Sequence, residues 1–115
     1  MKKKKLFGML LAVMTMMVFS LTSFAASGST AYVEGQLVRW GTNGTKATTW
    51  GINGNTRTYV SLTEEYMSSA GNTYVSSPVV KTGGSKAEVT YTPNGTFMSA
   101  WSYHGIAGKD LTLYL

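Results

Sequence analysis

Apolar residues recur among polar ones between Leu37 and Leu62, the stretch around which the rest of the chain is arranged. Two similar segments stand ten positions apart in this stretch, Trp40-Gly41-Thr42-Asn43-Gly44 and Trp50-Gly51-Ile52-Asn53-Gly54. Each contains an Asn-Gly pair, which favours the two consecutive positive φ angles of a tight β-hairpin. The eight residues between the pairs match the length of one strand. The pattern therefore predicts a three-stranded antiparallel meander.

If both loops have two residues, the pairing register places Trp40 opposite Ala47 and Trp50 opposite Arg57. Alternate side chains then separate onto two faces. The uncharged face, which we predict to be the core face, comprises Val38, Trp40, Ala47, Thr49, Thr58 and Val60. The other comprises Leu37, Arg39, Lys46, Thr48, Trp50, Ile52, Arg57 and Tyr59. Its mixture of rings and cations is typical of a solvated face or of a ligand surface, whose binding residues would be Arg39, Trp50, Arg57 and Tyr59.

Further short strands are expected at 32–40, 74–81, 87–92, 96–103 and 111–115, with a hairpin joining 87–92 to 96–103. Residues 61–72 form either one helical turn or a continued strand with a turn at 69–72, and the alternation favours the strand. On the penultimate strand, the face carrying Phe97, Trp101 and Tyr103 is expected to be core. Seven or eight short strands predict an all-β fold, a small antiparallel β-sandwich or barrel.

The N-terminus has the three-part pattern of a secretory signal peptide. Four lysines, Lys2–Lys5, precede an apolar run from Leu6 to Phe19, and Ser23-Phe24-Ala25 supplies small residues for cleavage before Ala26. The alternative is an uncleaved membrane anchor, but the apolar run is short for that role. We therefore expect a signal peptide at 1–25, a flexible tail at 26–31 and a single all-β domain at 32–115. The protein would be secreted and would meet the membrane only through the signal peptide.

Removal of the signal peptide changes the charge of the chain. The full sequence has ten Lys and Arg, five Asp and Glu and a net charge of +5. Four of the cations lie in the leader, which leaves six against five acids and a net charge of +1. Such a domain has no extended basic patch, so nucleic acid is not an expected partner. Cysteine is absent, which excludes disulfides and thiolate chemistry.

Residues that could perform catalysis are few. Glu64 and Glu65 are neighbours, so on a strand they point to opposite faces and cannot flank one glycosidic bond; both are expected at the surface. The single histidine, His104, is expected in a turn beside a glycine, without the partners of a triad or a metal site. The segment 83–86, Gly-Gly-Ser-Lys, lacks the spacing of a phosphate-binding loop. We therefore expect no enzyme activity, no cofactor and no metal site.

The leader, the early Trp40-Gly41, the late glycine and tryptophan at Gly95 and Trp101, and the aromatic end at Tyr114 together resemble the lactococcin-type β-sandwich bacteriocins. The chain departs from that family in having one histidine and a longer domain. The resemblance implies a secreted antimicrobial protein that binds a cell-wall precursor at the envelope of related bacteria. The alternative is a secreted, non-enzymatic module that binds an envelope glycan by aromatic stacking.

Overall fold

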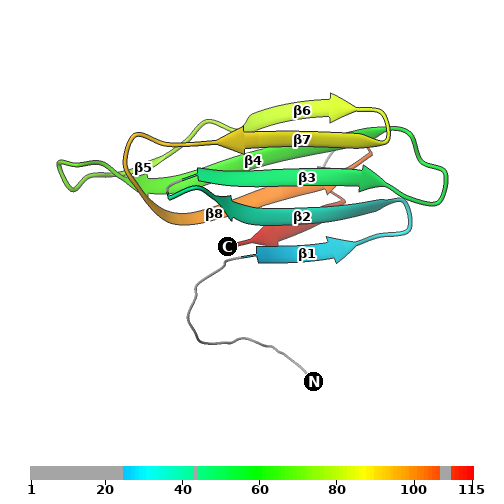
Figure 1. Ribbon diagram of the computed structural model, residues 1–115, viewed down its shortest axis with the longest axis horizontal. Helices are drawn as coiled ribbons and strands as arrows, with labels where there is room; N and C mark the ends of the chain where they lie inside the picture. The colour runs from blue at the N-terminus through cyan, green and yellow to red at the C-terminus, as the bar shows by residue number, and fades with distance from the viewer. Residues whose placement is uncertain (1–24, 43, 107–109) are drawn as a thin grey trace, which may run out of the picture.

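The computed structural model describes residues 25–42, 44–106 and 110–115. These residues form nine strands in two sheets and no helix (Figure 1), which confirms the predicted all-β fold. Sheet A contains β1 (Ala25–Ser29), β2 (Val33–Trp40), β3 (Gly44–Gly51) and β7 (Lys86–Tyr91). Sheet B contains β4 (Thr58–Met67), β5 (Thr73–Val75), β6 (Val79–Gly83), β8 (Thr96–Gly105) and β9 (Leu111–Tyr114).

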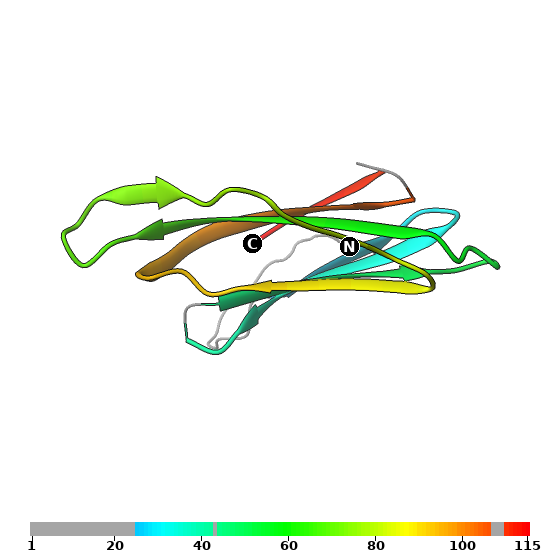
Figure 2. The same cartoon turned by 90° about the horizontal axis from the view of Figure 1, so that it is seen from above.

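The two sheets pack face to face as a β-sandwich, with all strand pairs antiparallel (Figure 2). Sheet A has the order β1-β2-β3-β7, and sheet B has the order β5-β4-β8-β9, with β6 also paired to β4. The chain builds three strands of sheet A, crosses to sheet B for β4 to β6, returns for β7 and ends in sheet B. Consecutive strands at each crossing therefore lie in different sheets and do not pair.

The core lies between the sheets and consists of alternate residues from both. Its buried apolar members are Val33, Leu37, Ala47, Val60, Leu62, Ala87, Val89, Ala100 and Leu113. Leu37 on β2 lies directly opposite Ala47 on β3, and both are fully buried. Burial of a leucine side chain contributes about 1.5–3 kcal/mol, so this register is strongly favoured over one that exposes Leu37.

The first hairpin has a different register from the one predicted. Trp40 pairs with Gly44, not with Ala47, so the connection is longer than two residues. This shift of three positions exchanges the two faces of β2, because side chains alternate along a strand. Trp40 is therefore 52% exposed, and its predicted place in the core is wrong. The positive φ angle belongs to Gly41, at 73°, and not to Gly44; Asn43 lies outside the described residues.

The second Asn-Gly pair has the predicted backbone angles, with φ of 54° at Asn53 and 82° at Gly54. It does not close a hairpin, however, because β3 and β4 belong to different sheets. The corner is held by side-chain amides: Asn53 donates to the carbonyl oxygen of Ala31 at 2.6 Å, and Asn55 donates to that of Tyr32 at 3.0 Å. These bonds attach the corner to the turn between β1 and β2, and the predicted meander is wrong beyond β3.

Strand β8 also differs from its prediction. It pairs with β4 and β9, so the expected hairpin with β7 does not exist. Its buried inner residues are Ala100, Ser102 and His104, whereas Trp101 and Tyr103 alternate with them and lie on the outer side. The register shifts between Glu65 and Tyr66, where Met98 is the extra residue. This bulge returns Phe97 to the core side, so only one of the three aromatic residues packs against the core.

The predictions for the two ends of the domain had different outcomes. Residues 26–31 are not a flexible tail, because most of them belong to β1, whose Ala26 pairs with Leu37. The predicted signal peptide lies almost entirely outside the described residues. The final strand is confirmed, with Leu113 buried between more exposed neighbours.

The uncertain stretch 61–72 is a strand, as favoured: β4 continues to Met67 before a turn in which Gly71 has a φ of 87°. The single strand expected at 74–81 is instead two short strands, β5 and β6, that pair with different parts of β4. Pro78 lies in the connection between them, where its lack of an N–H group removes no hydrogen bond of the sheet.

Candidate functional site

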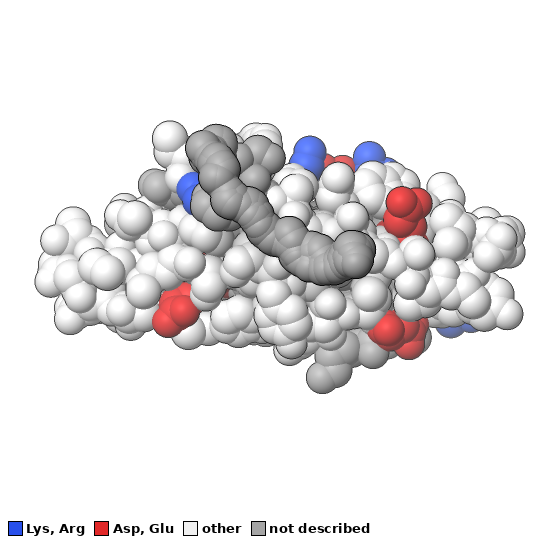
Figure 3. Space-filling view, turned by 90° about the horizontal axis from the view of Figure 1, so that it is seen from below, with Lys and Arg blue, Asp and Glu red and all other residues white. Residues whose placement is uncertain are grey.

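The outer side of sheet A carries two tryptophans and a group of polar side chains, and we call it the tryptophan face. The inward positions of its strands are buried, so the alternate positions point away from sheet B. The tryptophan face comprises Glu34, Gln36, Val38, Trp40, Lys46, Thr48, Trp50, Lys86, Glu88 and Thr90. Viewed from the side of β1, the surface of the described residues carries a few scattered charged groups among uncharged ones (Figure 3).

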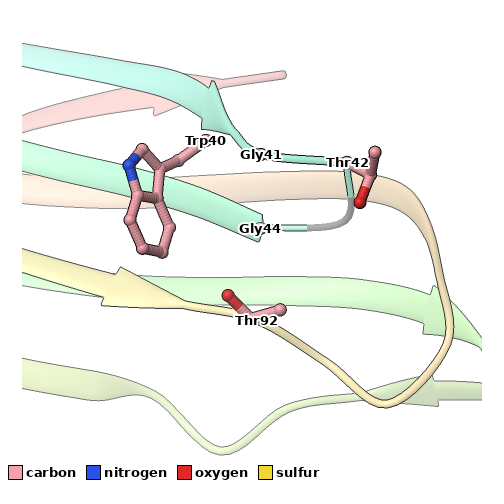
Figure 4. Close-up of a pocket in the computed structure, with 5 residues that line it drawn as sticks. All are labelled: Trp40, Gly41, Thr42, Gly44 and Thr92. Carbon is pink, nitrogen blue, oxygen red and sulfur yellow. The ribbon is translucent and has the colours of Figure 1, made fainter.

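One end of the tryptophan face is hollowed into an open pocket lined by Trp40, Gly41, Thr42, Gly44 and Thr92. Figure 4 shows the indole ring of Trp40 reaching from β2 across β3 towards Thr92. The ring can take this position because its partner in the register, Gly44, has no side chain. A Cβ atom on Gly44 would lie 2.8 Å from Oγ1 of Thr92, so glycine also allows β3 and the end of β7 to approach closely. The result is an exposed aromatic wall beside two hydroxyl groups.

Arg39 supports the pocket from the inner side of the hairpin. Its guanidinium group lies over the ring of Phe97 on β8, with Cζ 4.1 Å from the ring centroid. The same group donates a hydrogen bond to the carbonyl oxygen of Thr42, which lines the pocket. A cation over an aromatic ring is attracted by the negative charge on the face of the ring. Arg39 therefore connects the hairpin that carries Trp40 to sheet B.

Trp50 occupies the opposite end of the tryptophan face and is only partly exposed. Between the two tryptophans, the carboxylate of Glu88 on β7 pairs with two lysines, at 3.5 Å from Nζ of Lys46 and 3.2 Å from Nζ of Lys86. The hydrogen bond from Lys86 and the positive charges of both lysines lower the pKa of Glu88, so it is ionised at neutral pH. This part of the face thus carries a network of three charged groups, those of Lys46, Lys86 and Glu88.

The four residues predicted as a ligand site are not brought together. Arg39 points towards sheet B, and Trp50 lies on the tryptophan face. Arg57 is exposed in the corner before β4, and Tyr59 lies on the outer side of sheet B. The predicted grouping depended on pairing β3 with β4, which the crossing between sheets prevents. Trp40, which the sequence placed in the core, is the aromatic residue that lines the pocket.

Glu64 was expected at the surface but is fully buried in the core. Its Oε1 accepts a hydrogen bond of 2.9 Å from the hydroxyl of Thr45, and its Oε2 has no hydrogen-bond partner among the described residues. Burial raises the pKa of Glu64 to about 7, although the hydrogen bond from Thr45 and the charge of Arg39 lower it in part. Its neighbour Glu65 faces the other way and accepts a hydrogen bond from Ser99, which confirms the predicted opposition of the two carboxylates.

His104 is also fully buried, and not in a turn as predicted. Its Nδ1 lies 2.7 Å from Oγ1 of Thr49, and its Nε2 lies 2.7 Å from Oγ of Ser102. Because the Thr49 hydroxyl donates to the carbonyl oxygen of Tyr59, it accepts from the ring, and the neutral ring carries its proton on Nδ1. Burial lowers the pKa of His104 to about 4, so the ring is neutral at physiological pH.

Glu64 and His104 were missed because charge and polarity argue against burial in a short alternating strand. The sequence does hold one relevant signal: both residues share the parity of core positions on their strands, with Val60 and Leu62 before Glu64, and Ala100 before His104. Neither side chain reaches the surface, so neither contacts a ligand at the tryptophan face.

The described part of the chain contains no group of three or more His, Cys, Asp or Glu side chains that could hold a metal ion. Within the same residues, no helix has the length and apolar character needed to span a membrane. Comparisons of the chain with protein-family models, with curated proteins and with solved structures gave no match. The resemblance to lactococcin-type bacteriocins accordingly stays a prediction from the sequence.

Proposed function

We propose that the protein is a secreted, non-enzymatic binding protein that holds sugar rings of a bacterial envelope glycan in the Trp40 pocket. The single observation that carries this proposal is the position of Trp40, whose side chain is half exposed and forms the wall of an open pocket. Leaving a tryptophan in water is unfavourable, because its large apolar surface is better placed in a core or against a ligand. The other residues of the pocket indicate which ligand fits.

The lining of the pocket has the chemistry that a sugar ring requires. A pyranose has an apolar face of C–H groups, which can lie against the negatively charged face of an indole ring. Its hydroxyl groups need hydrogen-bond partners, and Thr42 and Thr92 supply hydroxyls that both donate and accept. Gly41 and Gly44 add no side chains, so the ring of Trp40 stays accessible. A small-molecule site usually combines an apolar wall with a small number of polar groups beside it.

The sequence predicts two functions, and the geometry favours the binding module over the bacteriocin. The pocket supports recognition of a glycan, whereas growth inhibition of related bacteria rests on the leader and the resemblance. Both functions begin with binding at the cell envelope, so they share the pocket. Export itself follows from the signal peptide pattern and is part of the proposal.

The test is sedimentation of the secreted protein with purified bacterial cell walls, for the parent and two variants. Trp40→Ala removes the wall of the pocket, and binding should weaken roughly tenfold to a hundredfold, the range expected for loss of one stacked ring. Tyr114→Ala is the matched control, because this tyrosine is 69% exposed on β9 in the other sheet. Equal binding by the parent and Trp40→Ala, or no binding by the parent, would refute the proposal.

A growth-inhibition assay with the same three proteins separates the two functions. A bacteriocin-like protein inhibits related strains and loses that activity in Trp40→Ala. A binding module sediments with walls but leaves growth unchanged.

A further inference from the structure

Trp40 and Trp50 lie on the same face at opposite ends of one pair of strands. In the register of β2 with β3, Trp40 pairs with Gly44, and Trp50 pairs with Glu34. The two pairs are therefore six positions apart along each strand. A strand rises about 3.4 Å per residue, so the two tryptophan positions are roughly 20 Å apart. One sugar ring cannot reach both.

Apart from Val38, the side chains between the two tryptophans are polar, and the charged residues of the face together carry no net charge. From β2 and β3, Gln36 and Lys46 contribute hydrogen-bonding groups to this strip. The four charged residues of the face are two acids and two bases: Glu34, Glu88, Lys46 and Lys86. Glu88 pairs with both lysines, and Glu34 supplies the second negative charge that brings the net charge of the face to zero. An anionic polymer would find no surplus of positive charge on this face.

The strands beneath the strip exclude one alternative ligand, an extended peptide that adds to the sheet. Such a peptide binds through the free backbone groups of an edge strand. Strands β2 and β3 are both interior strands of sheet A, with a partner on each side. Their backbone groups are used in the sheet, so a ligand on this face is recognised by side chains alone.

We propose that the tryptophan face is a linear platform for an uncharged, extended polysaccharide, which runs along β2 and β3 from Trp40 to Trp50. The inference rests on the proposed function and names its ligand class. One sugar unit stacks in the Trp40 pocket, units in the middle meet the polar strip, and a distant unit of the same chain reaches Trp50. Affinity therefore depends on chain length, because a short oligosaccharide engages Trp40 only.

The experiment measures the dissociation constant for β-1,4-linked N-acetylglucosamine oligomers and for β-1,4-linked glucose oligomers, each from one to eight units. With at least one series, affinity for the parent protein should rise by tenfold or more between the shortest bound oligomer and the length that spans both tryptophans, and then level off. Trp50→Ala should bind short oligomers like the parent and lose the gain for long ones. Trp40→Ala should weaken binding at every length. Tyr114→Ala, on the other sheet, should match the parent throughout.

The outcomes separate this inference from the proposed function. Binding by the parent with an affinity that does not change with length refutes the platform and leaves the Trp40 pocket standing. A length-dependent gain that survives in Trp50→Ala also refutes it. Failure of the parent to bind either series or cell walls refutes the proposed function itself. The length dependence of the parent needs no variant, so the inference is testable even if Trp50→Ala does not fold.

Discussion

Gly35 of β2 lies directly against the imidazole ring of His104 on β8. A Cβ atom built on Gly35 would be 2.8 Å from Cγ of His104 and 2.9 Å from its Nδ1, closer than such atoms approach in proteins. Both residues are buried, and the ring is fixed by the hydroxyls of Thr49 and Ser102. The absence of a side chain at Gly35 therefore creates the space in which the histidine sits between the two sheets.

The first prediction tests this contact with a double-mutant cycle. Gly35→Ala should destabilise the domain by about 1–3 kcal/mol, because the new methyl group overlaps a ring that cannot move. His104→Ala should also destabilise it, since it leaves a cavity and removes the ring partner of the Thr49 and Ser102 hydroxyls. In the double variant the methyl group occupies part of that cavity, so the cost should be less than the sum of the two single costs. Urea denaturation measures all three, and strict additivity would contradict the contact.

The second prediction concerns pH, where Glu64 and His104 have opposite effects. The folded-state pKa of Glu64 is raised from 4.5 to about 7, so the folded protein binds more protons than the unfolded chain and its stability falls as pH rises from 4.5 to 7. The folded-state pKa of His104 is lowered from 6.5 to about 4, so stability falls as pH drops from 6.5 to 4. The two slopes should largely cancel between pH 4.5 and 6.5.

Single variants should reveal each slope. In His104→Gln, stability should decrease as pH rises through this window; in Glu64→Gln, it should decrease as pH falls. Each change amounts to at most about 3 kcal/mol between the limits of the titration. Glu88 does not disturb the comparison, because its pKa is lowered and it titrates below the window. Chemical denaturation at several pH values provides the measurement, and a parent slope as steep as either variant's would show that the cancellation is absent.

Much of the fold could be predicted from the sequence, because alternation and turn residues are local signals. They located most strands, the corner at Asn53-Gly54 and the all-β class. They could not determine which sheet a strand joins. A turn with positive φ angles fits a hairpin and a crossing between sheets equally well. In the structure, hydrogen bonds from Asn53 and Asn55 attach this corner to the turn between β1 and β2. Those bonds join residues more than twenty positions apart.

The candidate site could not be predicted for a related reason. The core face of β2 could be the side with Val38 and Trp40 or the side with Leu37 and Arg39. Because Arg39 is charged, the sequence favoured the side with Val38 and Trp40, which is the exposed side in the structure. In the structure, Arg39 is accommodated on the inner side by the ring of Phe97 and the charge of Glu64. These partners come from β8 and β4, so nothing near Arg39 in the sequence indicates that its charge is tolerated there.

The third prediction compares Gly54 and Gly44. The sequence predicts a positive φ at both, but in the structure the two positions require glycine for different reasons. Gly54 has a φ of 82° with no atom within 4 Å of an added Cβ, so Gly54→Ala should cost about 1 kcal/mol through backbone strain alone. Gly44 lacks a positive φ, but its Cβ would lie 2.7 Å from the carbonyl oxygen of Trp40. Gly44→Ala should therefore cost about 1–3 kcal/mol through steric overlap. Denaturation midpoints test both, and a Gly44→Ala midpoint equal to the parent's would contradict the hairpin geometry.

The fourth prediction concerns processing. Secreted material should begin at Ala26, as the leader pattern indicates, and N-terminal mass spectrometry of the culture supernatant measures it. Cleavage at this position removes only Ala25 from β1 and leaves the pairs from Ala26 to Ser29 with β2. Recovery of the full-length chain from membranes alone would show instead that the leader is retained as an anchor.

The last prediction reverses the expectation that Trp40 stabilises the core. Had its side chain been buried, Trp40→Ala would cost about 3–5 kcal/mol. Because the side chain is 52% exposed and its partner is a glycine, the cost should instead be no more than about 1 kcal/mol. Leu37→Ala, three residues away on the buried side of the same strand, should cost about 2–5 kcal/mol.

Urea denaturation of the two variants beside the parent measures the difference. If Trp40→Ala is the more destabilised of the two, the register of the first hairpin is wrong, and with it the exposed pocket. If Leu37→Ala is the more destabilised and Trp40→Ala costs no more than about 1 kcal/mol, the Trp40→Ala protein keeps most of its stability and stays folded. Any loss of binding to cell walls by that variant then reports on the pocket and not on the stability of the fold.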